Sequence, residues 1–421
     1  MAKNGERGRK LLDISYLILL ACFFFYRVFR NTMFVKTYEI GRFQRLEHLW
    51  LYASFALIVL KVLYLRLYSL LELALAVLLC LVCLLAWRES RLYWILMMPL
   101  VVVAGKGISF DRILDCFLWI VGGTLLVTYL CTLFALIPNL EYVRLVPTEE
   151  LPEGAYAISR FAMGTTYPTT FSEFIFFLSA AGLYRRRRCL RFFDPLILLL
   201  IAVGLWKVCD ARTDVLAVLC LFFISIWLML RLRLPEKAGK VLNSLSALLI
   251  PVMALAASAM TALAVLYSEG SGKMAELDEL FHMRLSFGHE GYVKYGITLF
   301  GSQVKYKRTG GRVVDQLDVP GYFNLDCSYH LILINFGLIL LILLLFLFTL
   351  SSYQAWRMKD PALLLILAAV AAECVMENRL IHAQYDVFLL IFFAAHQTAA
   401  GACYQIIGRA KEKGSVDQIC G

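Results

Sequence analysis

The chain has 421 residues, of which 61% are hydrophobic and 17% charged, whereas about 25% of residues are charged in ordinary soluble domains. This composition excludes a soluble globular protein. The formal net charge of +10 would favour nucleic acid in a soluble protein, but the basic residues here crowd beside apolar blocks, so we expect a lipid bilayer as partner and no nucleic acid. The blocks are long enough to cross a bilayer and lack the alternation of a membrane β-barrel, so they predict helices.

The predicted fold is a single all-α integral membrane domain that covers residues 1–421 and has about 12 transmembrane helices. The basic N-terminus runs into an apolar stretch without a small-residue cleavage site, which predicts a retained first span. In chain order, the predicted spans are Ile14–Phe29, Leu49–Leu67, Leu70–Trp87, Leu92–Ile108, Ile113–Ile137, Tyr167–Tyr184, Phe192–Trp206, Val215–Leu230, Leu245–Tyr267, Leu331–Leu350, Ala362–Met376 and Val387–Cys403.

Lysine and arginine beside the spans predict the orientation, because cytoplasmic loops carry an excess of both. The strongest cluster is Arg185–Arg188, and three more lie at residues 231–240, 357–359 and 409–413. With twelve spans these clusters and both termini share one face, which we interpret as cytoplasmic. The first loop on the other face opposes the rule, and we expect such a basic outer loop to serve an anionic lipid substrate. Its basic residues are Arg30, Lys36, Arg42 and Arg45.

The orientation assigns three notable segments to the outer side. Residues 138–160 are acidic and contain prolines, and residues 207–214 form a short turn. Residues 268–329, between predicted spans 9 and 10, form a loop far longer than a typical connection, and loops of such length are usually functional. This loop contains an amphipathic part and a glycine-rich basic part. We expect it to form a small outer subdomain that carries the chemistry.

Four short polar patterns lie at the outer ends of spans, and three of them contain an arginine. Arginine is the expected residue where phosphate oxygens are gripped by a planar, permanently charged fork. The alternative for each arginine is that it only extends to the membrane interface. In chain order the patterns are Arg160 with Gly164 and Pro168, Asp210 with Arg212 and Thr213, Arg284-Leu285 with Tyr295-Gly296 and Phe300-Gly301, and Asp326 with Ser328, Tyr329 and His330.

In their order and their places among the spans, these patterns resemble the O-antigen ligase and polymerase superfamily of bacterial surface-polysaccharide assembly, most closely the polymerases of capsule and exopolysaccharide clusters. The first is similar to Arg-x-x-x-Gly-Phe-x-x-Pro-Asn, with Thr165 and Thr169 in place of Phe and Asn. The second matches Thr/Ser-x-Ser-Arg-Thr only in Arg212-Thr213. The third resembles Ser-Gly-Arg-Leu, and the fourth Asp-Asn-Ser-Tyr-Leu.

The resemblance implies a membrane-embedded, metal-independent glycosyltransferase of GT-C-like architecture that uses no cofactor. It would polymerise undecaprenyl-diphosphate-linked oligosaccharide repeat units into a surface polysaccharide at the outer face of the bacterial cytoplasmic membrane. The expected partners are the lipid-linked donor and acceptor, together with the flippase and chain-length regulator of the pathway. The implied catalytic residues are Arg212 and Arg284 on the diphosphate, Asp326 as general base and His330 as second candidate for that role. The implied substrate-binding residues are Arg160, Tyr167, Thr213, Tyr295, Ser328 and Tyr329.

Several alternatives stay open. The first alternative function is a flippase or other transporter of lipid-linked sugars, and the second is a ligase that transfers glycan to another acceptor. We disfavour a transporter because the sequence has no visible internal repeat and has a single dominant outer loop. Glu173, Glu373 and Glu377 in or near spans are either functional or simply paired. Cys209 and Cys327 lie near outer motifs, and their pairing in a disulfide is undecided.

Overall fold

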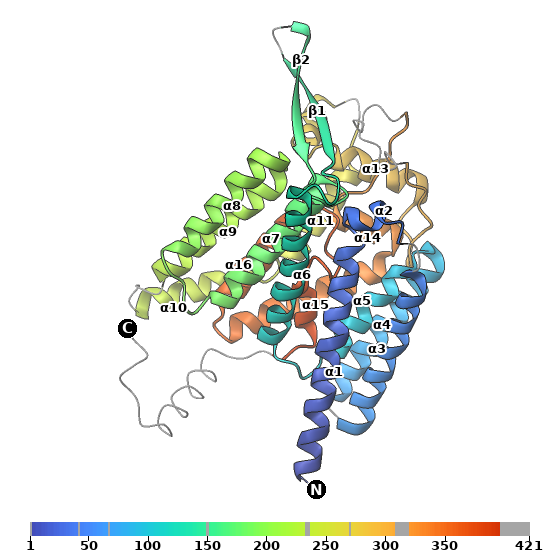
Figure 1. Cartoon of the computed structure of the whole chain (residues 1–421), viewed down its shortest axis with the longest axis vertical. Coiled ribbons are helices and arrows are strands. Elements are labelled where there is room, and N and C mark those ends of the chain that lie inside the picture. The colour runs from blue at the N-terminus through green and yellow to red at the C-terminus, as the bar shows by residue number, and fades with distance from the viewer. Residues whose placement is uncertain are drawn as a thin grey trace.

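The computed structural model describes residues 2–40, 43–65, 68–148, 151–231, 236–268, 271–307 and 320–395, and nearly all of its secondary structure is helical (Figure 1). The first half of the chain forms a group of long helices followed by a two-stranded hairpin. Its elements are α1 (Ala2–Phe29), α2 (Met33–Thr37), α3 (Phe43–Leu65), α4 (Leu70–Ser90), the 3-10 helix η1 (Tyr93–Leu96), α5 (Met97–Ala104), α6 (Phe110–Leu133), β1 (Glu141–Thr148) and β2 (Leu151–Phe161).

The second half adds further long helices and a cluster of short ones between α11 and α15. Its elements are α7 (Pro168–Arg186), α8 (Phe193–Cys209), α9 (Arg212–Arg231), α10 (Glu236–Leu245), η2 (Ser246–Leu249), α11 (Val252–Val265), α12 (Gly272–Leu280), α13 (Arg284–Tyr295), α14 (Ser328–Asn335), α15 (Leu338–Arg357), α16 (Pro361–Met376) and η4 (Val387–Phe392).

Within the described ranges, 7 helical segments are long and apolar enough to cross a membrane. They present large apolar side chains outward, such as Leu63, Leu70 and Trp119, which are 73%, 86% and 80% exposed. Outward apolar surface of this extent belongs in lipid. The chain is therefore a multi-pass, helical membrane protein, as its composition predicts. The seven segments are Gly8–Phe29, Arg45–Leu63, Leu70–Ser90, Phe110–Leu133, Arg212–Arg231, Val241–Val265 and Leu338–Arg357.

The total of twelve spans stays a prediction, because several predicted spans are shorter or interrupted in the structure. Predicted span Leu92–Ile108 contains η1 and then α5, which has only 8 residues. Predicted span Leu331–Leu350 is divided by Gly337 into α14 and α15. Predicted span Val387–Cys403 begins with the buried 3-10 helix η4, and its part from residue 396 lies outside the described residues. Average hydropathy does not detect such breaks, since the flanking residues are apolar on both sides.

Residues 138–160, expected to form an acidic loop, instead contain the antiparallel hairpin β1–β2, which projects beyond the helices (Figure 1). We call this the hairpin end of the bundle. Helix α7 begins shortly after β2 and runs away from the hairpin, so its last residues, Arg185 and Arg186, lie at the opposite end. Arg187 contacts Asp360 there, with 3.3 Å between Nε and Oδ2. The predicted basic clusters at 185–188 and 357–359 thus share one end, whereas cluster 409–413 lies outside the described residues.

The predicted loop 268–329 contains α12, α13 and an extended segment, and this segment is tied to the break between α14 and α15. Backbone N–H groups of Leu338 and Ser302 donate to the carbonyls of Thr298 and Ile334, both at 2.9 Å. These bonds satisfy an amide at the start of α15 that has no partner within its own helix. They also require close backbone approach: a Cβ on Gly337, which has φ +90°, would lie 2.3 Å from the Leu299 carbonyl oxygen.

We therefore expect Gly337→Ala to destabilise the protein strongly. A left-handed φ costs a residue with Cβ about 1–2 kcal/mol, and the clash with a backbone carbonyl adds to this cost. The matched control is Gly204→Ala in α8, where a Cβ meets nothing within 4 Å. Thermal melting of the purified variants in detergent should show a lower melting temperature for Gly337→Ala only. Equal melting temperatures would mean that the close backbone contact at Gly337 does not contribute to stability.

Candidate functional site

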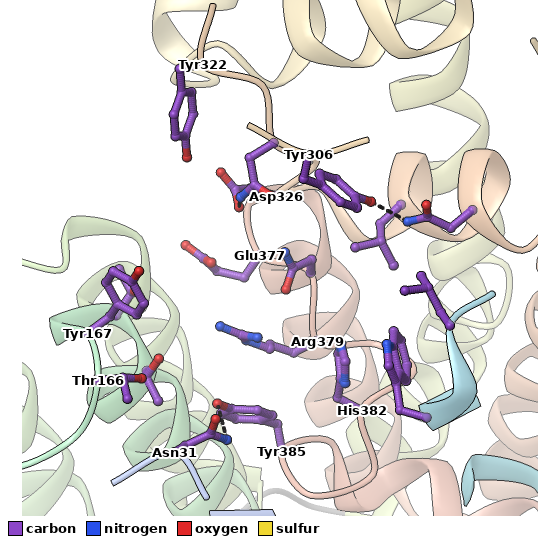
Figure 2. Close-up of a pocket in the computed structure, with 18 residues that line it drawn as sticks. Asn31, Thr166, Tyr167, Tyr306, Tyr322, Asp326, Glu377, Arg379, His382 and Tyr385 are labelled. Atoms are coloured by element: carbon purple, nitrogen blue, oxygen red, sulfur yellow. Dashed lines mark hydrogen bonds between the residues drawn. The ribbon is translucent and has the colours of Figure 1, made fainter. Parts of the chain in front are cut away.

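A polar cavity of about 440 Å³ lies at the hairpin end of the bundle; we call it the chamber. Its walls come from the segments that follow α1, β2 and α16 and from the segment that precedes and includes α14. Figure 2 shows its side chains converging on a common space. The lining residues are Asn31, Leu92, Trp94, Thr166, Tyr167, Thr169, Thr170, Tyr306, Tyr322, Asn324, Asp326, Leu331, Asn335, Glu377, Asn378, Arg379, His382 and Tyr385.

Arg379 supplies the permanent positive charge of the chamber. It follows α16, where the chain turns before η4. Its Nε donates to the carboxylate of Glu173, which is fully buried on α7. Its guanidinium also lies over the ring of Tyr385, 4.5 Å from the centroid. Held on two sides, the guanidinium loses little freedom when it binds an anion, and Figure 2 shows it beside Glu377 and above Tyr385.

Two carboxyl groups, Asp326 and Glu377, face the chamber near Arg379 (Figure 2). The amide of Asn324 donates to Asp326, which is only half-buried. Burial raises the pKa of Glu377 well above its usual range, and the neighbouring charge of Glu173 adds to this effect. Arg284 opposes the rise, with 3.8 Å between its Nη2 and Glu377 Oε1. The two acids therefore differ in environment, which is the arrangement that assigns separate proton-transfer roles to a pair of carboxyl groups.

Aromatic rings surround these charged groups. Trp94 stacks on His382 with 4.3 Å between ring centroids. Tyr306 stacks on Phe323 at 6.2 Å and accepts a hydrogen bond from the amide of Asn335. Flat rings next to a few convergent polar groups are typical of small-molecule sites, and aromatic side chains present both an apolar face and a polar tip to a ligand.

Two predicted site residues, Tyr167 and Asp326, line the chamber, and three others support it. Arg284 Nε donates to the Met376 carbonyl at 3.1 Å. The hydroxyl of Ser328 donates to the Glu377 carbonyl at 2.6 Å and accepts from Leu380 N. The hydroxyl of Tyr329 donates to the Ala371 carbonyl at 2.8 Å. The third and fourth motifs thus hold the end of α16 and the loop that presents Glu377 and Arg379.

The other predicted site residues do not line the chamber. Arg160 Nε donates to the Cys209 carbonyl at 3.0 Å, and Arg212 Nε lies 3.6 Å from Asp210 Oδ1, so these two arginines gather at the junction of α8 and α9. Thr213 follows Arg212 at the start of α9. The hydroxyl of Tyr295 accepts from Lys305 N at 3.0 Å, within the extended part of the long loop.

His330, the second candidate for general base, is buried and hydrogen-bonded away from the chamber. Its Nε2 lies 3.1 Å from the Met260 carbonyl oxygen, and its ring makes a T-shaped contact with the Tyr292 ring. Burial lowers the pKa of His330 to about 4, so its imidazole is neutral at neutral pH. Because it does not line the chamber, it has no direct access to a substrate bound there.

Sequence reasoning missed Arg379 and singled out Glu377 only as a charge near a span. The signal was present: Glu377-Asn378-Arg379 is a charged tripeptide between two apolar blocks, and charges at membrane depth usually have a function or a partner. Asn31, His382 and Tyr385 had no such signal, because single polar residues at the ends of spans are common.

Cys209 and Cys327, whose pairing was left open, are both buried free thiols. Among the described residues, no group of three or more His, Cys, Asp or Glu side chains is arranged to hold a metal ion.

The fold and the chamber define a multi-pass membrane protein with a polar, arginine-containing cavity at one end of its helices. Comparison of the chain with protein-family models, curated proteins and solved structures gives no match.

Proposed function

We propose that this protein is a membrane-embedded glycosyltransferase that polymerises undecaprenyl-diphosphate-linked oligosaccharide repeat units into a surface polysaccharide. The observation that carries the proposal is the chamber itself, in which Arg379 and two carboxyl groups lie among aromatic rings at one end of apolar helices. A diphosphate requires a cation, a sugar hydroxyl that attacks requires a proton acceptor, and sugar rings require flat apolar surfaces. The chamber offers all three beside the membrane layer.

In the proposed reaction, the lipid-linked donor places its diphosphate at Arg379. A hydroxyl of the acceptor sugar attacks the anomeric carbon of the donor, and its oxygen forms the new glycosidic bond. The bond from that carbon to the diphosphate oxygen breaks, and undecaprenyl diphosphate leaves with the electron pair. Arg379 stabilises the negative charge that develops on this oxygen. Asp326 accepts the hydroxyl proton.

Glu377 in the chamber wall and Arg284 beside it complete this scheme. The raised pKa of Glu377 favours its protonated form, which can donate a hydrogen bond, while Arg284 lies beside it. The motif resemblance implies a diphosphate role for Arg284 and Arg212 as well, although neither residue lines the chamber. The proposal includes the bacterial cytoplasmic membrane as location, a GT-C-like architecture, and the flippase and chain-length regulator of the pathway as partners.

The proposal is tested with purified protein in liposomes, supplied with lipid-linked repeat units extracted from cells that lack this gene. We expect a ladder of polymer lengths on a gel, with undecaprenyl diphosphate released at each step. If the protein instead moves the units across the bilayer without joining them, it is a flippase. Transfer of one unit to a different acceptor, without a ladder, would identify a ligase.

The proposed orientation, with the hairpin end outside the cell, is tested by labelling intact cells with a membrane-impermeant maleimide. A cysteine placed at Lys305, which is exposed in the long loop, should be modified. The native Cys189 is exposed and lies close behind the arginine cluster at the opposite end, so it should react only after the cells are permeabilised. The reverse pattern would invert the orientation and contradict chemistry at the outer face.

A further inference from the structure

We propose that a second site, an apolar pocket between the hairpin ends of α1 and α3, holds the isoprenoid tail of a phosphate-bearing lipid, whose phosphate is bound by Arg27 and Arg30. The link between this site and the chamber rests on the proposed function. Lipid binding at this site can be tested independently of the proposed function, because the probe is a lipid phosphate that carries no sugar.

The pocket has a volume of about 350 Å³ and is lined by apolar side chains, among them Cys22, Phe29, Trp50 and Met97. Both helices are candidate membrane spans. Two residues of the pocket face outward, Phe25 with 51% and Leu46 with 54% of their surface exposed. An apolar hollow that opens toward hydrocarbon at one end of the spans suits a flexible apolar chain better than a water-soluble ligand.

Charged groups at the rim of the pocket identify the head of this lipid. The carboxylate of Glu47 accepts from the hydroxyl of Tyr26 at 2.5 Å and from Arg30 Nη1 at 2.7 Å. Arg27 Nη1 lies 4.0 Å from the same Glu47 oxygen. Two guanidinium groups share this one carboxylate, so the three side chains carry a net positive charge. Guanidinium groups with donors to spare bind phosphate oxygens in pairs.

The basic character extends to the connection between α1 and α3. Lys36 and Arg45 are exposed there and add two positive charges near the rim. This is the loop that opposes the usual distribution of lysine and arginine, and an anionic ligand gives a physical reason for the exception. Arg42, also basic, lies outside the described residues.

The rim is continuous with the chamber. Asn31, one helical turn after Arg27, donates from Nδ2 to the Arg27 carbonyl at 3.2 Å and to the Tyr385 hydroxyl at 3.3 Å. Asn31 and Tyr385 line the chamber, and Arg379 lies over the Tyr385 ring (Figure 2). A lipid with its tail in the pocket and its phosphate at Arg27 would therefore extend its sugars toward the chamber, where the proposed reaction places the diphosphate of the donor at Arg379. This continuity favours a polyprenyl diphosphate-sugar over an ordinary phospholipid.

The test measures binding of undecaprenyl phosphate, which has no sugar and cannot react, to the purified full-length protein in nanodiscs. The first variant is Arg27→Gln/Arg30→Gln/Glu47→Gln, which removes both cations together with their carboxylate so that no charge is left unpaired. The second, Cys22→Trp, fills the pocket and keeps the charges. We expect each to weaken binding about tenfold or more.

The matched control is Arg186→Gln/Asp194→Asn. Its ion pair borders an apolar pocket of about 370 Å³ between α7 and α8, at the other end of the protein. Binding should be unchanged in this control, and melting temperatures confirm that all variants are folded. Wild-type binding in both test variants would overturn the proposal. Equal loss of phosphatidylglycerol binding would overturn the assignment to an isoprenoid lipid. If both test variants lose undecaprenyl phosphate binding but the wild-type protein forms no polymer, the lipid site is supported and the proposed function is contradicted.

Discussion

The double variant Arg379→Gln/Glu173→Gln is expected to lose polymer formation by about a hundredfold or more while the protein stays folded in the membrane. Arg379 is the only arginine among the chamber-lining residues that the structure describes, so its removal leaves the diphosphate without a direct cation. Replacing Arg379 alone would leave Glu173 buried without its partner, which costs about 3–5 kcal/mol and would confuse loss of activity with loss of folding. The double variant removes both charges together.

The measurement is the rate of polymer formation by purified protein in liposomes, normalised to folded protein. Arg379→Lys is the informative partner variant, because it keeps one positive charge and removes the planar fork; we expect it to rescue poorly. Arg186→Gln/Asp194→Asn serves as control, since it deletes an arginine–aspartate pair at the opposite end. A double variant of Arg379 and Glu173 that makes polymer at the wild-type rate would remove Arg379 from the mechanism.

The second large effect is expected from Asp326→Asn, which keeps the shape of the side chain and removes the proton acceptor. A general base contributes about 10²–10⁴-fold to such a step, so polymer should fall by that factor. Cells with this variant should accumulate single lipid-linked repeat units on the outer leaflet, flipped but not joined. Build-up on the inner leaflet would instead indicate a flippase and end the polymerase proposal.

Glu377→Gln separates the two carboxyl groups of the chamber. Because burial and Glu173 raise the pKa of Glu377, this carboxyl keeps its proton to higher pH than an ordinary glutamate and loses it as the pH rises further. Its ionisation would add a negative charge beside Asp326 and the diphosphate. We therefore expect wild-type activity to decline on the alkaline side and Glu377→Gln, which cannot ionise, to lose that decline. An unchanged pH profile in Glu377→Gln would show that Glu377 does not cause the alkaline decline, and full activity of Asp326→Asn would show that Asp326 is not the base.

The membrane class and most helices could be predicted because they depend on composition and on the length of apolar blocks. The predicted span Ala362–Met376 differs from α16 by one residue at its start. The hairpin β1–β2 was not predicted, because the acidic residues and prolines of its segment indicated a loop. The helix break at Gly337 was not predicted for another reason: it depends on a backbone contact with Leu299, which is distant in the sequence.

The site shows the same division. Asp326 and Tyr167 belong to local patterns at span ends, and the structure has both in the chamber. Arg379 belongs to none of these sequence patterns. Its position is fixed by the buried Glu173 on α7, which is distant in the sequence. Arg160 and Arg212 meet at Cys209–Asp210, whereas Arg284 contacts Glu377. The sequence pattern could not predict this separation, because spacing along the chain does not give the distances between the three arginines in the fold.

The backbone hydrogen bonds between the long loop and the start of α15 affect how a substrate can reach the chamber. Tyr306 lies on the tied segment and Tyr322 on the return to α14, so both cover the chamber from a roof that is bonded through backbone atoms. Such bonds do not loosen when a side chain changes its rotamer. Under the proposed function, we expect glycolipids to enter and leave sideways between helices, at a rate that depends on the surrounding lipid. Turnover would slow in a viscous bilayer and would hardly respond to a crosslink across the roof.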